Sequence, residues 1–296
     1  MNKGVLFGIG AYLMWGFFPI YFKALHQVPP LQIMMHRIVW SFLFVIFIIL
    51  IRKQWSRFVD SLRQPRILLT YTVTAFLLAV NWLIYIYGIN SDQVVETSLG
   101  YFINPLLSVA LGVIFLHERL RAMQWVPVAL VGFGVIYLTL QYGEPPWIAL
   151  ALAFSFGVYG LLKKIAPLGA LQGLSLETGI IFFPAVIYLL YAEFQGSGAF
   201  GHLGWQSNFL LAFVGVITAL PLLFFGLAAR SIPLTLLGIL QYIAPTVQFL
   251  LGVFLYDEPF TINRLIGFAI IWLALIIFTV EGLQQRRKSA AAAIPT

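Results

Sequence analysis

The chain has 296 residues, of which 61% are hydrophobic and 9% are charged, and its formal net charge is +7. A soluble domain carries roughly 25% charged residues, so this composition excludes an ordinary soluble fold. The basic residues lie in short connections between apolar blocks, which indicates orientation in a membrane rather than binding to nucleic acid. The chain has no cysteine, which excludes a disulfide framework and a thiolate metal site.

Ten apolar blocks follow one another along the chain, with lengths close to the roughly 20 residues of helix that cross a hydrocarbon core. The predicted spans are 4–23, 32–51, 67–89, 97–116, 124–141, 146–162, 174–192, 207–228, 234–255 and 264–281. The first span has no small-residue cleavage site of the kind that ends a signal peptide, so it is expected to stay as a helix. The sequence therefore predicts an all-α integral membrane protein with ten transmembrane helices in contact with lipid.

The Lys and Arg residues of the connections predict the orientation. With the N-terminus inside, fourteen of them fall on the inner side, whereas Lys23 and Arg264 fall on the outer side and Arg37 lies within a span. Short cytoplasmic connections carry the excess of Lys and Arg in membrane proteins. We therefore expect a multi-pass protein of a bacterial inner (plasma) membrane with both termini in the cytoplasm.

An internal repeat divides the chain into two halves. Residues 104–118 align without a gap on residues 244–258, so that Pro105 matches Pro245 and Glu118 matches Glu258. Each half holds five spans, an odd number, so the second half is inverted in the membrane, as in many secondary transporters. The expected units are 1–142 for the first five-helix repeat, 143–284 for the second, and 285–296 for a disordered cytoplasmic tail.

Several short motifs resemble those of a known transporter family. They are Ala11–Gly16, Met35–Ser41 with its His36-Arg37 pair, Asn81–Leu83, Ser98–Pro105, Ala153–Gly157 and Gln241–Pro245. In these motifs, which extend over nearly the whole chain, the sequence is similar to the EamA family of the drug/metabolite transporter superfamily, and within it to the RarD-type permeases. The resemblance implies an inner-membrane permease that moves small metabolites or drugs, often outward, by alternating access.

His36 and Arg37 are the principal candidates for binding a substrate. A charge at membrane depth costs a few kcal/mol, so an intramembrane Arg is a functional candidate. Arg37 either snorkels to the outer headgroups or faces the bundle interior and holds an anionic group. His36 either makes a hydrogen-bonded contact between helices or titrates near neutral pH.

Other polar and aromatic residues lie well inside their spans and could complete a substrate site. Trp40 and Trp82 fit helix packing or a stacking wall better than an interfacial belt, and Trp15 either lines a cavity or shapes the first helix. The full set of expected substrate-binding residues is Trp15, His36, Arg37, Trp40, Asn81, Trp82, Tyr85, Tyr101, Asn104, Gln241 and Tyr242. The polar members could instead be ordinary hydrogen-bonding contacts between helices.

Hinges, gates and proton coupling have their own candidates. Pro105 and Pro245 occupy matching positions and are each expected to interrupt a helix in its middle. Glu118 and Glu258 lie at membrane boundaries, where they are either structural or act at gates. Glu177 could carry a proton together with His36, or could be a carboxylate at the inner boundary.

These patterns predict a secondary transporter, not an enzyme, for a small metabolite or drug-like molecule, with an anionic or zwitterionic molecule as one possibility. The alternatives are an intramembrane enzyme acting on a lipid-linked group and a sensor subunit that does not transport. The sequence indicates no cofactor, metal site or nucleic-acid partner, and it leaves the oligomeric state open.

Overall fold

The computed structural model describes residues 3–116, 122–142, 145–231 and 240–258, followed by a discontinuous set of residues between 261 and 284. Secondary structure over the described residues is helical, without strands. The helices of the first half are α1 (Lys3–Gly16), α2 (Phe18–Lys23), α3 (Pro30–Ile51), α4 (Trp55–Leu62), α5 (Pro65–Asn90), α6 (Val94–Leu116) and α7 (Ala122–Tyr142). Those of the second half are α8 (Trp147–Ile165), α9 (Ala170–Phe194), α10 (Trp205–Ser231), α12 (Ile243–Leu250) and the π-helix η1 (Leu251–Leu255).

Five helical segments of the described residues are long and apolar enough to cross a membrane. They are Lys3–Lys23, Pro30–Ile51, Pro65–Asn90, Ala170–Phe194 and Trp205–Phe225. The expectation of an all-α membrane protein is confirmed. The number of ten spans stays a prediction, because parts of the ninth and tenth lie outside the described residues.

The first predicted span is broken between α1 and α2, where Phe17 lies outside both helices. Pro19 has no backbone N–H, so it cannot bond the carbonyl of Trp15 four residues earlier. The side-chain amide of Gln248, at 2.9 Å, donates a hydrogen bond to that carbonyl instead. A residue far along the chain thus satisfies the polar group that the break exposes.

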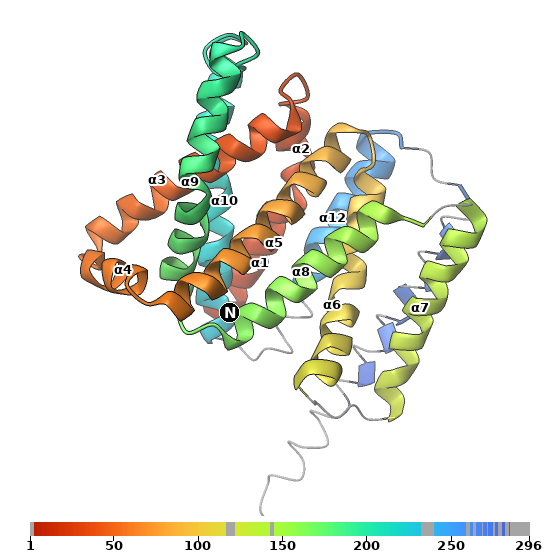
Figure 1. Ribbon diagram of the computed structural model, residues 1–296. Helices are drawn as coiled ribbons and strands as arrows, with labels where there is room; N and C mark the ends of the chain where they lie inside the picture. Colours follow the sequence, from red (N-terminus) through yellow and green to blue (C-terminus); the bar gives the residue numbers. More distant parts are fainter. Residues whose placement is uncertain are drawn as a thin grey trace, which may run out of the picture.

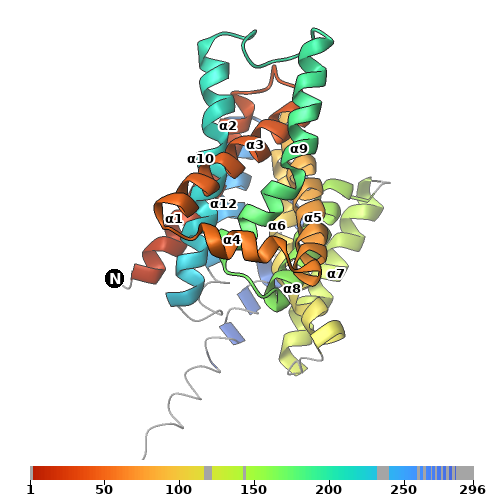
Figure 2. The same ribbon diagram turned by 60° about the vertical axis from the view of Figure 1, so that its left-hand side comes forward.

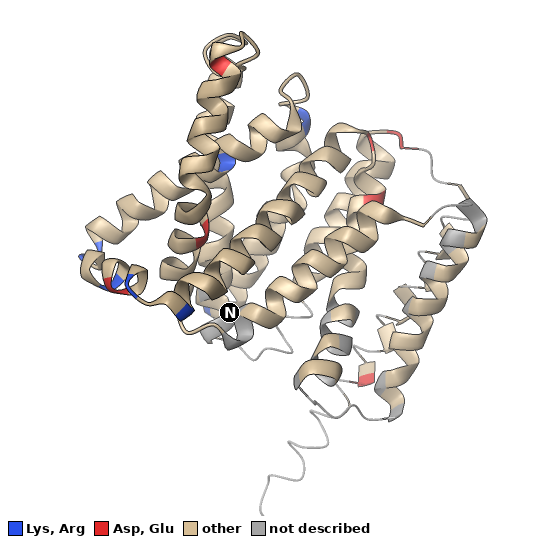
Figure 3. Cartoon of the chain, viewed as in Figure 1, with Lys and Arg blue, Asp and Glu red and all other residues tan. Residues whose placement is uncertain are grey.

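The connection 52–66 contains a short helix, α4, that we did not predict. Its apolar residues Trp55, Phe58, Val59 and Leu62 share one face, the spacing of an amphipathic helix. Figure 2 shows α4 running crosswise to α5 and α9 at one end of the bundle, and Figure 3 shows Lys and Arg gathered around it. An amphipathic helix with basic residues at the end of a helical bundle fits a position in the membrane interface.

Helices of one half pack mainly on helices of the other (Figure 1). Helix α10 lies against α1 and α3, α9 lies against α3 and α5, and α8 lies against α5 and α6. The approach of α3 to α10 is close, because a Cβ atom on Gly215 would overlap the backbone of Trp40. Small residues permit this type of backbone contact between membrane helices.

The two matched prolines differ in their surroundings. Helix α6 continues through residue 105, so the expectation that Pro105 interrupts its helix is wrong. Neighbouring helices and local adjustments let a membrane helix continue through a proline. The ninth predicted span is interrupted at Tyr242, between helical residues 240–241 and α12, three residues before Pro245, which lies in the first turn of α12.

Candidate functional site

Helix α3 presents two faces to two different neighbours. Arg37 and Ser41 face α10, where the Arg37 Nε donates a hydrogen bond to the Thr218 hydroxyl at 2.8 Å and Ser41 approaches the Gly215 carbonyl. Arg37 is 3% exposed. The structure therefore places the guanidinium inside the bundle and not among the headgroups.

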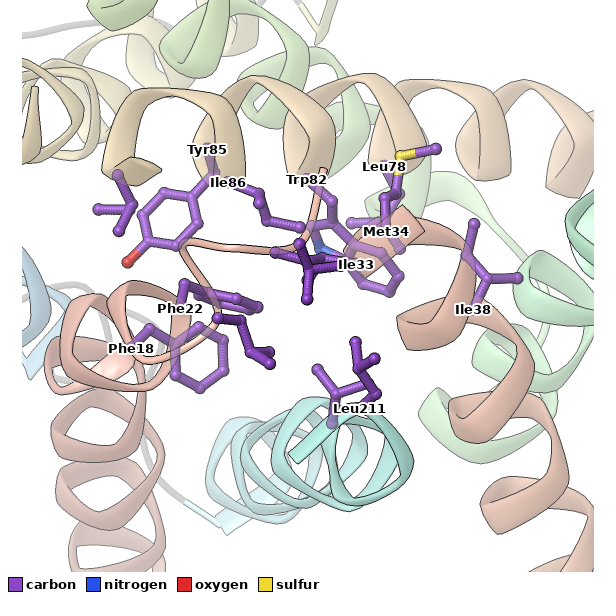
Figure 4. Close-up of a cluster of buried hydrophobic side chains, with 14 of the residues drawn as sticks. Phe18, Phe22, Ile33, Met34, Ile38, Leu78, Trp82, Tyr85, Ile86 and Leu211 are labelled. Carbon is purple, nitrogen blue, oxygen red and sulfur yellow. The ribbon is translucent and has the colours of Figure 1, made fainter. Parts of the chain in front are cut away.

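Aromatic rings enclose the Arg37 guanidinium. Its Cζ atom lies 4.0 Å from the ring centre of Trp82, 5.4 Å from that of Phe22 and 5.5 Å from that of Phe18. Figure 4 shows these three rings in one cluster of buried side chains, to which α2, α3, α5 and α10 all contribute. A cation over an aromatic face gains roughly 0.5 to 2 kcal/mol, so the rings offset part of the cost of burying the charge.

The hydrogen bonds of Arg37 are incomplete. Its Nη1 has no hydrogen-bond partner among the described residues, and no described carboxylate forms a salt bridge with it. The buried hydroxyl of Tyr85 also lacks a partner there. A buried charged donor without an acceptor is costly, so this centre has unused capacity to bind an anion.

Tyr101 and Asn81 lie beside this centre. The rings of Tyr85 and Tyr101 are 5.8 Å apart, and the Tyr101 hydroxyl approaches the Asn81 Oδ1 at 3.4 Å. The Asn81 amide donates to the Leu152 carbonyl at 3.1 Å and to the Ser155 hydroxyl at 2.9 Å. Asn81 therefore links α5 to α8, in the manner of a polar contact between helices.

The remaining candidates from the fourth, ninth and first spans lie in other surroundings. Tyr242 stacks on Phe102 with ring centres 6.5 Å apart, while Trp15 packs on Phe225 at 6.0 Å. Asn104 is buried, and its Oδ1 has no partner among the described residues. Gln241 is half-buried. Trp15 also packs against the cluster that includes Phe18, Phe22 and Trp82. The rings over the Arg37 guanidinium among the described residues are those of Phe18, Phe22 and Trp82.

Glu177 is another buried charged residue, with 1% exposure. The Tyr159 hydroxyl donates to its Oε2 at 3.3 Å. A small cavity of about 10 Å³, near the size that holds one water molecule, lies between Glu177 and a wall that includes Leu78 and Trp82. Trp82 therefore contacts Arg37 and also lines the cavity at Glu177.

His36 and Trp40 do not share the enclosure of Arg37. They line a separate pocket of about 340 Å³ between α3, α9 and the connection that follows α9. Neither the Nδ1 of His36 nor the Nε1 of Trp40 has a hydrogen-bond partner among the described residues. The sequence predicted one site for these residues and Arg37, and the structure divides it into two.

Glu258 has a structural contact at the membrane boundary, the first of the two roles that we expected for it. Its carboxylate accepts hydrogen bonds from the backbone N–H groups of Val94 at 2.6 Å and Val95 at 2.8 Å. It thereby caps the start of α6, where a negative charge is favourable. Glu118, its counterpart in the repeat, lies outside the described residues.

Sequence reasoning missed several contacts around these residues. Thr218, Phe18 and Phe22 complete the surroundings of Arg37, and the hydroxyl of Thr218 in mid-span is a signal that could have been found. Lys23 pairs with Asp92 and lies 4.6 Å from the ring centre of Tyr256. These last contacts join α2, the connection after α5 and the end of η1.

Comparisons with known proteins show the family of this chain. The model of the EamA-like transporter family matches residues 2–140. "Protein RarD" of Streptomyces exfoliatus is 46% identical over 100% of this chain and 95% of its own length. "Uncharacterized transporter YojE" of Bacillus subtilis is 44% identical over 97% of both chains, and "Protein RarD" of Escherichia coli K12 is 40% identical over 98% of both.

A solved crystal structure shares the fold. It is 19% identical, with a TM-score of 0.60 over 94% of this chain and 97% of the other. The fold, the buried interior and the full-length relatives lead to one assignment: the chain is a multi-pass membrane protein that belongs to the EamA family of the drug/metabolite transporter superfamily, among the RarD-type permeases.

Proposed function

We propose that this protein is a secondary transporter that moves a small molecule bearing an anionic group across the bacterial inner membrane by alternating access. The direction is export or exchange, and both termini face the cytoplasm. The observation that carries the proposal is the buried, aromatic-enclosed Arg37, whose Nη1 has no acceptor among the described residues.

The surroundings of Arg37 offset only part of the free energy that is needed to bury its charge. Burying an ion costs several kcal/mol even after relaxation of its surroundings. The hydrogen bond to Thr218 and the ring of Trp82 return part of that cost, but neither supplies a negative charge. A carboxylate or other anionic group of a mobile guest would complete the hydrogen bonds of Arg37, with Trp82 and Tyr85 as walls.

The packing of the two halves supports alternating access. Helices α3 and α9 begin 140 residues apart, at Pro30 and Ala170, and so do α5 and α10, at Pro65 and Trp205. The contact of α1 with α10 has its counterpart in the contact of α8 with α5. Two halves related in this way can exchange conformations and open a central site to each side in turn.

The test is transport by purified protein reconstituted in liposomes. Radiolabelled small carboxylates and α-amino acids are screened for counterflow, with protein-free liposomes as the blank. We expect saturable movement of at least one anionic or zwitterionic compound, without chemical change of that compound. Conversion of a compound without its movement across the membrane would contradict the proposal.

A further inference from the structure

The pocket of about 340 Å³ beside α3 is distinct from the Arg37 centre. Its walls are Gln32, His36, Val39 and Trp40 from α3, Val186, Leu189, Leu190 and Glu193 from α9, and Gly198, Ala199 and Phe200 from the connection after α9. Its volume lies within the range of small-molecule sites, and its walls are mainly apolar with a few polar groups, as such sites are.

The roof of this pocket is held in place by hydrogen bonds. The Gln32 side-chain amide donates to the Ser197 carbonyl at 2.8 Å, and its Oε1 accepts from the Ala199 backbone N–H at 2.9 Å. These bonds position Phe200, whose ring centre lies 5.2 Å from that of His36 and 6.1 Å from that of Trp40. Three aromatic side chains therefore gather around the pocket.

Unused polar groups mark the pocket as a binding site. His36 is 6% exposed, and its Nδ1 has no hydrogen-bond partner among the described residues. The buried Nε1 of Trp40 also lacks one there. Buried polar groups are normally hydrogen-bonded, and the unpaired Nδ1 of His36 can accept a hydrogen bond from a donor group of a ligand.

The formal charge of the pocket walls is negative. Glu193 is half-exposed, and its Oε1 lies 2.8 Å from the Nε2 of His202. This contact holds the carboxylate at the edge of the pocket. Gly198 leaves room for the other carboxylate oxygen, because a Cβ atom there would overlap it.

We propose that this pocket binds a lipophilic amine, an organic cation with an apolar or aromatic body. The ammonium group pairs with Glu193, which is a charge-complementary partner at the rim. The apolar body lies against Val186 and Leu189, with the aromatic faces of Trp40 and Phe200 beside it, where cations and rings are both favoured. The exposed Ile187 and Leu190 on α9 place the pocket next to lipid, from which such a molecule partitions.

The experiment uses two probes of equal size, 4-phenylbutylamine and 4-phenylbutanol, which differ in charge. Their binding to the purified protein in lipid nanodiscs is measured by calorimetry, with empty nanodiscs as the blank. We expect the amine to bind roughly five to ten times more tightly than the alcohol. Glu193→Gln, which keeps the shape of the side chain, is expected to remove this preference.

Matched variants locate the binding. Leu189→Trp fills the pocket and is expected to weaken the binding of both probes at least tenfold. Ile187→Trp, two residues earlier on the same helix and on its exposed side, leaves their binding unchanged. Arg37→Gln is also expected to leave the affinities of both probes unchanged, so the result of this test does not depend on the proposed anion site at Arg37.

Three results of the binding measurements would overturn the proposal. They are equal affinities of the two probes for the unaltered protein, a preference for the amine that survives Glu193→Gln, and unchanged binding in Leu189→Trp. A phospholipid that co-purifies in the pocket and that neither probe displaces also overturns it, because the occupant is then a lipid chain.

Discussion

Arg37 and Glu177 are two buried charged residues at corresponding positions of α3 and α9. Each is the eighth residue of its helix, because α3 begins at Pro30 and α9 at Ala170, and the two are 3% and 1% exposed. Seven residues of helix correspond to about 10 Å of depth. In the proposed inverted arrangement, Arg37 lies that far from the outer end of its helix and Glu177 that far from the inner end.

The two surroundings differ in chemistry. Arg37 is enclosed by rings and bonded to one hydroxyl, whereas Glu177 accepts a hydrogen bond from Tyr159 and borders a small cavity. In the proposed repeat, the helix position and the burial of this residue are therefore the same in both halves, whereas the sign of its charge differs. In the proposed transporter, such a site favours a substrate with a negative group near Arg37 and a positive group near Glu177. Trp82 lies between the two surroundings.

The largest effect is expected at Arg37. Arg37→Gln removes the charge that anchors the substrate anion, and loss of one partner of a buried charged pair costs about 2 to 5 kcal/mol. We expect the initial rate of transport in liposomes to fall by roughly a hundredfold or more, and Arg37→Lys to recover part of it. Elution as a single folded species in detergent is the control, and a rate near that of the unaltered protein would remove Arg37 from the mechanism.

A smaller and different effect is expected at Glu177. Glu177→Gln preserves an acceptor for Tyr159 but cannot exchange a proton. If the carboxylate couples transport to protons, net transport driven by a pH gradient falls by about tenfold, while exchange of labelled for unlabelled substrate continues. Equal losses in both assays would assign Glu177 to packing instead of coupling.

The smallest effect is expected at Trp82, and it tests whether this ring acts with Arg37 or with Glu177. Trp82→Leu keeps an apolar side chain but removes the aromatic face under Arg37, which lowers the free energy of unfolding by about 1 to 2 kcal/mol through the lost cation–π contact alone. Thermal unfolding of a double-mutant cycle separates this contact from packing. The coupling is expected with Arg37→Gln and not with Glu177→Gln, and the reverse result would tie Trp82 to the carboxylate.

Much of the fold could be predicted from the sequence, because lipid requires long apolar helices whose length and flanking charges are visible in the residues. The depth of Arg37 followed from its place near the start of a span. The division of His36 from Arg37 did not, although successive residues of a helix point in directions about 100° apart. Which face meets α9 and which meets α10 depends on packing between segments that are distant in the chain.

Other features of the candidate site also depend on tertiary contacts. The role of Glu258 as a cap of α6 and that of Asn81 as a link to α8 require partners far away in sequence. Pro105 does not interrupt α6, since a single missing hydrogen bond is tolerated when neighbouring helices support the chain. The short helix α4 could have been predicted, because its apolar residues are regularly spaced. It was missed because a segment of this length is too short to be considered as a membrane span.

The central claim is that Arg37 receives the anionic group of the transported molecule, and ligand-induced thermal stabilisation tests it most directly. The purified protein in detergent is heated with small carboxylates and α-amino acids, each paired with its primary amide of nearly equal size. The account predicts that an acid raises the unfolding midpoint, that its amide does not, and that Arg37→Gln loses the shift while the exposed-site variant Thr72→Val retains it. Equal stabilisation by an acid and its amide, or a shift that persists in Arg37→Gln, would contradict the account.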